Sequence, residues 1–141
     1  MARTLGLDVH VLNAGTERDL EAVFAKLAEL RASGLMISGD VFFASHTEQL
    51  AALAVRHAIP AVYTRRDFAM AGGLLSYGTE LTDSYRLAGF YTGRVLKGDK
   101  PADLPVQQAT KVQLIINLKA AKALGIVIPL PLQGRADELI E

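Results

Sequence analysis

The clearest structural signals in the chain lie in the stretch Asp103-Leu-Pro-Val-Gln-Gln-Ala-Thr-Lys-Val-Gln-Leu-Ile-Ile-Asn-Leu-Lys-Ala-Ala-Lys-Ala-Leu-Gly-Ile-Val-Ile-Pro129. The proline near its start favours an extended segment, because proline fixes φ and has no N–H to donate. Residues 111–117 then predict a buried strand, and residues 118–124 predict a short helix that ends at Gly125. A strand followed directly by a helix is typical of α/β proteins, and the same alternation extends upstream.

Four strand-like runs lie in the first 78 residues, and helical patterns connect them. The runs are residues 7–12, 34–38, 59–63 and 74–77. After the first run, Thr16 suits the N-cap of a helix, and apolar side chains recur at helical spacing through Leu30. Ser45 and Glu48 have the spacing of a capping box for a second helix. Parallel strands need such crossovers, so the sequence predicts a parallel, doubly wound, flavodoxin-like sheet with flanking helices.

The pattern changes after Gly78. Residues 81–96 predict one long helix, Pro101 and Pro105 predict an extended passage, and residues 132–140 predict a last helical piece. The sequence therefore divides into residues 1–78, an α/β portion, and residues 79–141, a segment of helix, arm, strand and helix.

Composition excludes several classes of protein. The chain has 141 residues, 50% of them hydrophobic, which is enough to bury a core. Fifteen basic residues balance fifteen acidic ones, so no net field attracts nucleic acid. The lack of cysteine excludes disulfides, thiolate metal sites and a cysteine nucleophile. No apolar run has the length of a signal peptide or of a membrane span.

Polar and aromatic side chains follow the predicted strands. Open parallel sheets bind ligands beyond the carboxyl ends of their strands, where loops and helix N-termini meet. Carboxylate, guanidinium, hydroxyl and aromatic groups at these ends suit a small zwitterionic or amide-bearing solute. We therefore expect a binding site made by Asp40, Phe42, Tyr63, Arg66, Ser76 and Tyr77.

Each of these residues also has a purely structural interpretation. Asp40 follows a strand, where aspartate is common as a turn residue or helix cap. Phe42 and Phe43 are adjacent, so at least one of them belongs to the core. Arg65 and Arg66 can form a solvated surface pair, and the two tyrosines can simply pack inside the protein.

No motif supports catalysis. The segment Gly93-Arg-Val-Leu-Lys-Gly-Asp-Lys100 superficially resembles a phosphate-binding loop, but Asp99 stands in place of its lysine and the segment ends a helix. His10, His46 and His57 lack the spacing of metal ligands. The Gly72-Gly73 pair is expected to permit a positive φ or a close approach of the backbone. The sequence thus predicts no enzyme activity, no metal and no cofactor.

The stretch 103–129, together with Gly72-Gly-Leu-Leu-Ser-Tyr-Gly78 and Arg135-Ala-Asp-Glu-Leu-Ile-Glu141, resembles the carboxyl-terminal half of ABC-transporter substrate-binding proteins. These proteins have the periplasmic binding protein type I architecture. The resemblance implies two doubly wound lobes, joined by three crossing strands, that close on a small solute and deliver it to a membrane permease. It also implies an amino-acid-like ligand and a periplasmic location. By position, residues 39–43, 63–66 and 76–78 match segments at the cleft of such proteins.

The resemblance does not include the amino-terminal lobe of this bilobal architecture. An incomplete lobe leaves an uncovered sheet edge and apolar surface, so we expect a homodimer, with or without exchanged carboxyl-terminal segments. The chain shows no signal peptide, which implies a cytoplasmic location if it is the complete gene product. The alternative interpretation is a flavodoxin-like regulatory or scaffold domain with no transport role.

Overall fold

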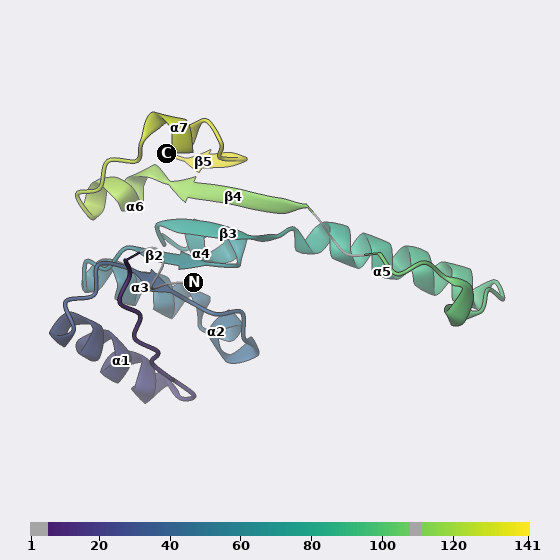
Figure 1. Ribbon diagram of the computed structural model, residues 1–141, viewed down its shortest axis with the longest axis horizontal. Helices are drawn as coiled ribbons and strands as arrows, with labels where there is room; N and C mark the ends of the chain where they lie inside the picture. Colours follow the sequence, from purple (N-terminus) through teal and green to yellow (C-terminus); the bar gives the residue numbers. More distant parts are fainter. Residues whose placement is uncertain (1–5, 108–110) are drawn as a thin grey trace.

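The chain forms one five-stranded sheet flanked by helices in a computed structural model that describes residues 6–107 and 111–141 (Figure 1). The strands lie in sequence order across the sheet. They are β1 (Leu35–Met36), β2 (Ala61–Tyr63), β3 (Leu75–Thr79), β4 (Val112–Asn117) and β5 (Glu138–Ile140). Neighbouring strands are parallel except β3 and β4, which are antiparallel. The predicted α/β class with a mainly parallel sheet is confirmed.

Seven helices accompany the strands in the described part of the chain. They are α1 (Glu17–Glu29), α2 (Val41–Ser45), α3 (Thr47–Arg56), α4 (Arg66–Met70), α5 (Leu81–Leu96), α6 (Leu118–Ala123) and α7 (Leu130–Gln133), with a 3₁₀ turn at Pro101–Asp103. As predicted, α1 begins after Thr16. The Thr16 hydroxyl accepts a hydrogen bond from Asp19 N–H at 3.3 Å, and the Asp19 carboxylate accepts one from Thr16 N–H at 2.9 Å. This capping box satisfies N–H groups that the first turn leaves unpaired.

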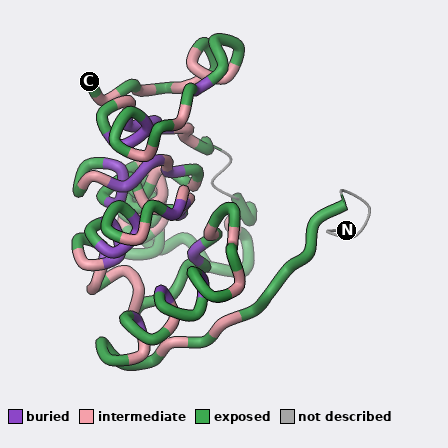
Figure 2. The backbone as a smooth tube through the Cα atoms, turned by 90° about the vertical axis from the view of Figure 1, so that its left-hand side faces the viewer, coloured by how far each residue is buried: buried purple, intermediate pink, exposed green. Residues whose placement is uncertain are grey.

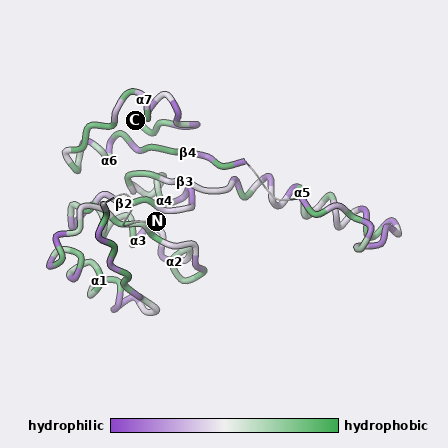
Figure 3. The backbone as a smooth tube through the Cα atoms, viewed as in Figure 1, coloured by the Kyte–Doolittle hydropathy of each residue, from purple (hydrophilic) through white to green (hydrophobic). Residues whose placement is uncertain are grey.

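Two clusters of buried side chains hold the helices to the sheet. The first joins α1 and α3 to the β1 and β2 side and includes Leu20, Phe24, Leu50, Leu53, Ala61, Tyr63 and Phe68. The second joins β4 to α6 and consists of Leu74, Ile116, Ala121 and Ile128. Figure 2 shows the buried segments gathered in the body of the molecule, and Figure 3 shows that β4 is hydrophobic over most of its length. The amphipathic patterns of α1 and α3 therefore identify their part of the core correctly.

Residues 7–12 do not form the predicted strand. Residues 7–11 belong to an arm that runs away from the rest of the molecule (Figure 2), and Leu7, Val9 and Val11 are 57%, 59% and 81% exposed, whereas Leu12 packs against the first core. No strand in the described ranges pairs with this arm. A strand forms only when its N–H and C=O groups pair with a neighbour, so alternation alone is insufficient here. Three strands, in place of four, begin within residues 6–78.

Two further local predictions are wrong. Ser45 does not cap a helix, because its hydroxyl donates to the Phe42 carbonyl, and Asp40 caps α2 by accepting from Phe42 N–H at 2.7 Å. Residues 132–140 contain the end of α7 and the strand β5. Parallel pairing of β5 with β4 outweighs the helical spacing of its apolar residues. Residues 108–110 of the predicted extended passage lie outside the described residues.

The helix α5 has its predicted bounds and stands apart from the sheet. It extends away from β3, and the segment that follows returns beside it toward β4 (Figure 1). The Tyr91 hydroxyl donates to the Pro105 carbonyl at 2.8 Å and ties this segment to the helix. No residue of α5 is buried, and Tyr85 and Leu96 are 74% and 82% exposed. The predicted division of the chain at residue 78, just before α5, stays a prediction.

Candidate functional site

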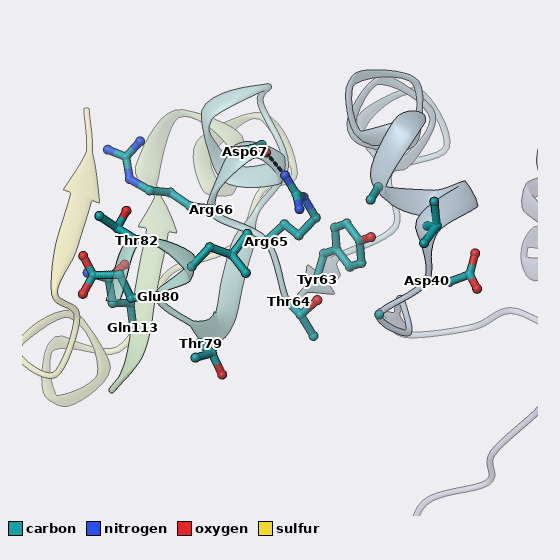
Figure 4. Close-up of a pocket in the computed structure, with 14 residues that line it drawn as sticks. Asp40, Tyr63, Thr64, Arg65, Arg66, Asp67, Thr79, Glu80, Thr82 and Gln113 are labelled. Atoms are coloured by element: carbon teal, nitrogen blue, oxygen red, sulfur yellow. Dashed lines mark hydrogen bonds and ion pairs between the residues drawn. The ribbon is translucent and has the colours of Figure 1, made fainter. Parts of the chain in front are cut away.

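An open cleft of about 770 Å³ lies at one edge of the sheet (Figure 4). Four segments line it: residues between 39 and 44 after β1, residues 63–67 at the end of β2, residues 79–82 at the end of β3, and Gln113 near the start of β4. The cleft therefore collects side chains from parts of the chain that are far apart in sequence.

The strand order explains why these segments meet. Since β1, β2 and β3 are parallel, their carboxyl ends lie at the same edge of the sheet. Because β4 is antiparallel to β3, its start lies at that edge too, with Val112 opposite Thr79. Residues beyond the strand ends are not committed to the sheet ladder, which leaves their polar groups available to a ligand.

Asp40 lies on the wall of the cleft that follows β1. It is exposed, and its Oδ1 accepts from Phe42 N–H at 2.7 Å. The structural interpretation, a helix cap, is therefore correct for this residue. A carboxylate can accept several hydrogen bonds, so capping leaves Asp40 able to accept one from a ligand.

Tyr63 ends β2 and lies deepest among the polar lining residues. It is 1% exposed, and its ring packs edge-on against Phe68 with ring centroids 5.9 Å apart. Its hydroxyl makes no hydrogen bond to any described residue. Burial raises the pKa of Tyr63 above its ordinary value of 10.0, and the nearby Arg65 guanidinium opposes part of this rise. At neutral pH the phenol is therefore protonated, and its O–H has no acceptor among the residues that the structure describes.

The two adjacent arginines of the cleft differ in their partners. Arg66 donates from Nε at 3.2 Å and from Nη2 at 2.8 Å to the Glu138 carboxylate, which joins α4 to β5. Arg65 donates from Nη2 to Asp67 Oδ2 at 2.5 Å, but its Nε is buried and has no acceptor within the described ranges. The guanidinium of Arg66 is thus engaged in the fold, while that of Arg65 keeps an unused donor.

The opposite wall, after β3, carries an ion pair between Glu80 and Lys111. Their charged atoms lie 2.5 Å apart, and the hydrogen bond to Glu80 raises the pKa of Lys111 above its ordinary value of 10.5. Thr79, Thr82 and Gln113 add neutral polar groups (Figure 4). Groups of both charges therefore surround the cleft, as a zwitterionic ligand requires.

The cleft brings together Asp40, Tyr63 and Arg66 of the six predicted site residues, and the other three lie elsewhere. Phe42 is half-buried and packs against the first core, and its ring lies tilted by 41° against that of His46 with ring centroids 4.4 Å apart. Ser76 is 2% exposed inside β3, and Tyr77 is 59% exposed. Successive side chains of a strand point to opposite faces, so Ser76 and Tyr77 cannot face one ligand together.

The lining residues that were not predicted include Arg65, Glu80 and Gln113. Arg65 had a usable signal, because in an extended chain it faces the same side as Tyr63, two residues earlier. Glu80 had the same signal as Asp40, since it follows the carboxyl end of a parallel strand. Gln113 had no such signal, since its position depends on the antiparallel register of β3 with β4.

Neither a metal centre nor a membrane span is found in the part of the chain that the structure describes. There, no three His, Cys, Asp or Glu side chains are grouped so as to hold a metal ion. No described helix combines the length and the apolar character that crossing a membrane requires.

The fold and the cleft define a class of α/β domains that bind small ligands at the carboxyl edge of a parallel sheet. Within that class, the chain belongs to the ABC transporter substrate binding protein family, which matches residues 1–140. The resemblance stated from the sequence is confirmed. No curated protein matches the chain.

Three solved structures share the fold. A conserved domain protein from Vibrio cholerae is 25% identical with a TM-score of 0.87, over 98% of this chain and 46% of that one. An ABC domain in complex with L-Trp from Streptococcus pneumoniae is 25% identical with a TM-score of 0.87, and the match covers 99% of this chain and 47% of that one. A ligand-free, open substrate binding protein with adhesive properties from Clostridium difficile is 20% identical with a TM-score of 0.68, and the match covers 99% of this chain and 46% of that one. The chain spans about half the length of these proteins.

Proposed function

We propose that the chain is part of the solute-binding component of an ABC importer and binds a small amino-acid-like solute without chemical conversion. Family membership supports a solute-binding role. The observation that carries the proposal is the cleft at the carboxyl ends of the parallel strands, which combines the Asp40 carboxylate with the donors of Tyr63 and Arg65. The L-Trp complex of the streptococcal protein supports an amino-acid-like ligand.

In this proposal the cleft residues take different parts of the solute. Asp40 accepts hydrogen bonds from the ammonium group. Val41 and Leu81, which line the cleft and are 85% and 45% exposed, offer apolar surface to the side chain of the solute. Arg66 is less suited than Asp40 to contact the solute, because such a contact would break the hydrogen bonds that Arg66 donates to Glu138.

Thermal unfolding of the purified chain with each standard L-amino acid tests this function. A ligand at 100 times its Kd adds about 2.7 kcal/mol to the free energy of unfolding, so at least one amino acid should raise Tm clearly. The matched variant is Asp40→Asn, because asparagine caps helices as well as aspartate does but carries no charge to meet an ammonium group. It should unfold at the wild-type temperature without ligand and lose most of the ligand-induced shift.

If no amino acid raises Tm, the proposal fails and the regulatory or scaffold alternative gains support. The other proposed properties follow from the same role: a membrane permease as partner, a periplasmic location and a homodimer. The homodimer draws its support from the apolar side chains that α5 leaves exposed.

A further inference from the structure

We infer that Arg65 and Tyr63 form the carboxylate-binding pair of the cleft, so that the solute is selected for a carboxylate group. This inference rests on the proposed function and assigns one part of the same site. It concerns Arg65 in particular, since the neighbouring Arg66 is already paired with Glu138.

The inference starts from two buried donors that nothing in the described residues satisfies. The Tyr63 hydroxyl and the Arg65 Nε–H are both buried without an acceptor, and both residues line the same cleft. Folded proteins satisfy nearly all buried polar groups, because each unsatisfied one costs free energy. Glu80 Oε2 is a third buried atom of this kind at the cleft, but it is an acceptor and lies 2.5 Å from Lys111 Nζ. The two donors point to a ligand that supplies the missing acceptors.

The backbone places these two donors on the same side. Tyr63 ends a strand, and Arg65 continues it in extended geometry, with φ −107° and ψ 133°. Residues two positions apart in an extended chain face the same way. Figure 4 shows the Arg65 guanidinium between Asp67 and the Tyr63 ring, while the Tyr63 hydroxyl points toward the start of α2.

The chemistry of the pair favours an anionic ligand group with two acceptor oxygens. The Asp40 N–H lies near the phenol oxygen, but the two lack hydrogen-bond geometry, and an N–H cannot accept the phenol proton. Asp67 holds the Arg65 guanidinium through Nη2 and leaves Nε–H free. A carboxylate offers an oxygen to each donor, whereas an ammonium group offers none.

The test compares L-tryptophan with tryptamine, which is the same molecule without its carboxylate. Both are titrated into the ¹⁵N-labelled full chain, and the Arg65 side-chain Nε–H signal is followed by NMR. L-tryptophan should shift this signal and bind at least about tenfold more tightly than tryptamine, the factor expected for losing a hydrogen bond to a charged group. In Arg65→Gln this preference should disappear.

The matched control is Arg56→Gln, which removes another paired arginine far from the cleft, on α3, where Arg56 bonds Glu21. It should keep the wild-type preference for L-tryptophan. Equal preference in wild type and Arg65→Gln overturns the inference and leaves the proposed function standing. If L-tryptophan does not bind, the amino acid that raises Tm most is compared with its own amine. Binding of no amino acid overturns the proposed function and the inference with it.

A second variant, Tyr63→Phe, tests the pair without any ligand. Removing a buried hydroxyl that has no partner should leave Tm of the ligand-free chain unchanged or raise it. The same variant should bind L-tryptophan more weakly. A clear fall in the ligand-free Tm shows that the hydroxyl already has a structural partner and overturns its assignment.

Discussion

Glycines 73 and 78 are required by close neighbours. A Cβ on Gly73 would overlap the Phe68 ring, and one on Gly78 would overlap the carbonyl oxygen of Thr64, a backbone atom that cannot easily move. Gly72 has φ +98°, which L side chains rarely adopt. The prediction that the Gly72-Gly73 pair serves backbone geometry is confirmed. Gly78 extends this role to the cleft, because Thr64 lies between Tyr63 and Arg65 in its lining.

Replacing Gly78 by alanine should destabilise the protein. The added methyl group forces the Thr64 backbone to shift, which typically costs about 1–3 kcal/mol in the free energy of unfolding. Gly89→Ala is the control, since a Cβ at Gly89 meets open space on α5 and should stabilise the helix by up to about 1 kcal/mol. Urea denaturation measures both changes. Changes of the same sign would contradict the close approach of Thr64 to Gly78.

The capping box of α1 should make stability depend on pH. Hydrogen bonds from the Gly15 N–H and from Thr16 lower the pKa of Asp19 below its ordinary value of 3.8. A carboxyl group with a lowered folded-state pKa contributes stability above 3.8 and loses it as pH falls through the folded-state pKa. Urea denaturation at neutral pH and at several values below 3.8 should show this loss in wild type and a smaller one in Asp19→Asn. An equal pH dependence in both proteins would exclude the capping role.

The ion pair between Arg66 and Glu138 joins two elements, α4 and β5, that are distant in sequence. Both side chains are about half exposed, so solvent screening limits the coupling to roughly 0.5–1 kcal/mol. A double-mutant cycle with Arg66→Gln and Glu138→Gln should measure this coupling by urea denaturation. The local pair Arg86–Asp83 on α5 serves as control and should give no more than about 0.5 kcal/mol. A coupling near zero for Arg66 and Glu138 means that the pair does not hold α4 to β5.

Elements with local signals are predicted well from the sequence, whereas elements that depend on a partner are not. α1 has its Thr16 N-cap, α5 has its helical spacing, and β4 has its apolar run. Residues 7–12 alternate like a strand but lack a neighbour, and residues 138–140 form a strand only because β4 lies beside them. Strand pairing is a long-range property that alternation cannot reveal.

The candidate site follows the same division. Asp40 and Tyr63 could be placed from the sequence because they follow strands whose carboxyl ends meet in any parallel sheet. Gln113 could not, since it reaches the cleft through the β3–β4 register. The sequence alone could not distinguish the roles of Arg65 and Arg66, because only the structure shows that Arg66 donates its hydrogen bonds to Glu138.

For the molecule as a whole, the exposed helix α5 predicts self-association. Its apolar residues Tyr85, Phe90 and Leu96 are 74%, 58% and 82% exposed, and a second copy would cover them. In size-exclusion chromatography with light scattering, the chain should have twice its 15.1 kDa mass. Tyr85→Lys should lower that mass toward a monomer and leave the circular dichroism spectrum unchanged. A wild-type chain that stays monomeric at micromolar concentration would rule out the dimer.

Mapping of L-tryptophan binding by backbone ¹H–¹⁵N chemical shifts tests most directly whether the cleft is the solute site. We expect the largest shifts in residues 39–41, 63–67 and 79–82, the three segments at the carboxyl ends of β1, β2 and β3. Shifts confined to the second hollow, which is lined by Glu48 and Met70, or no shifts with any amino acid, would contradict the proposed solute-binding site.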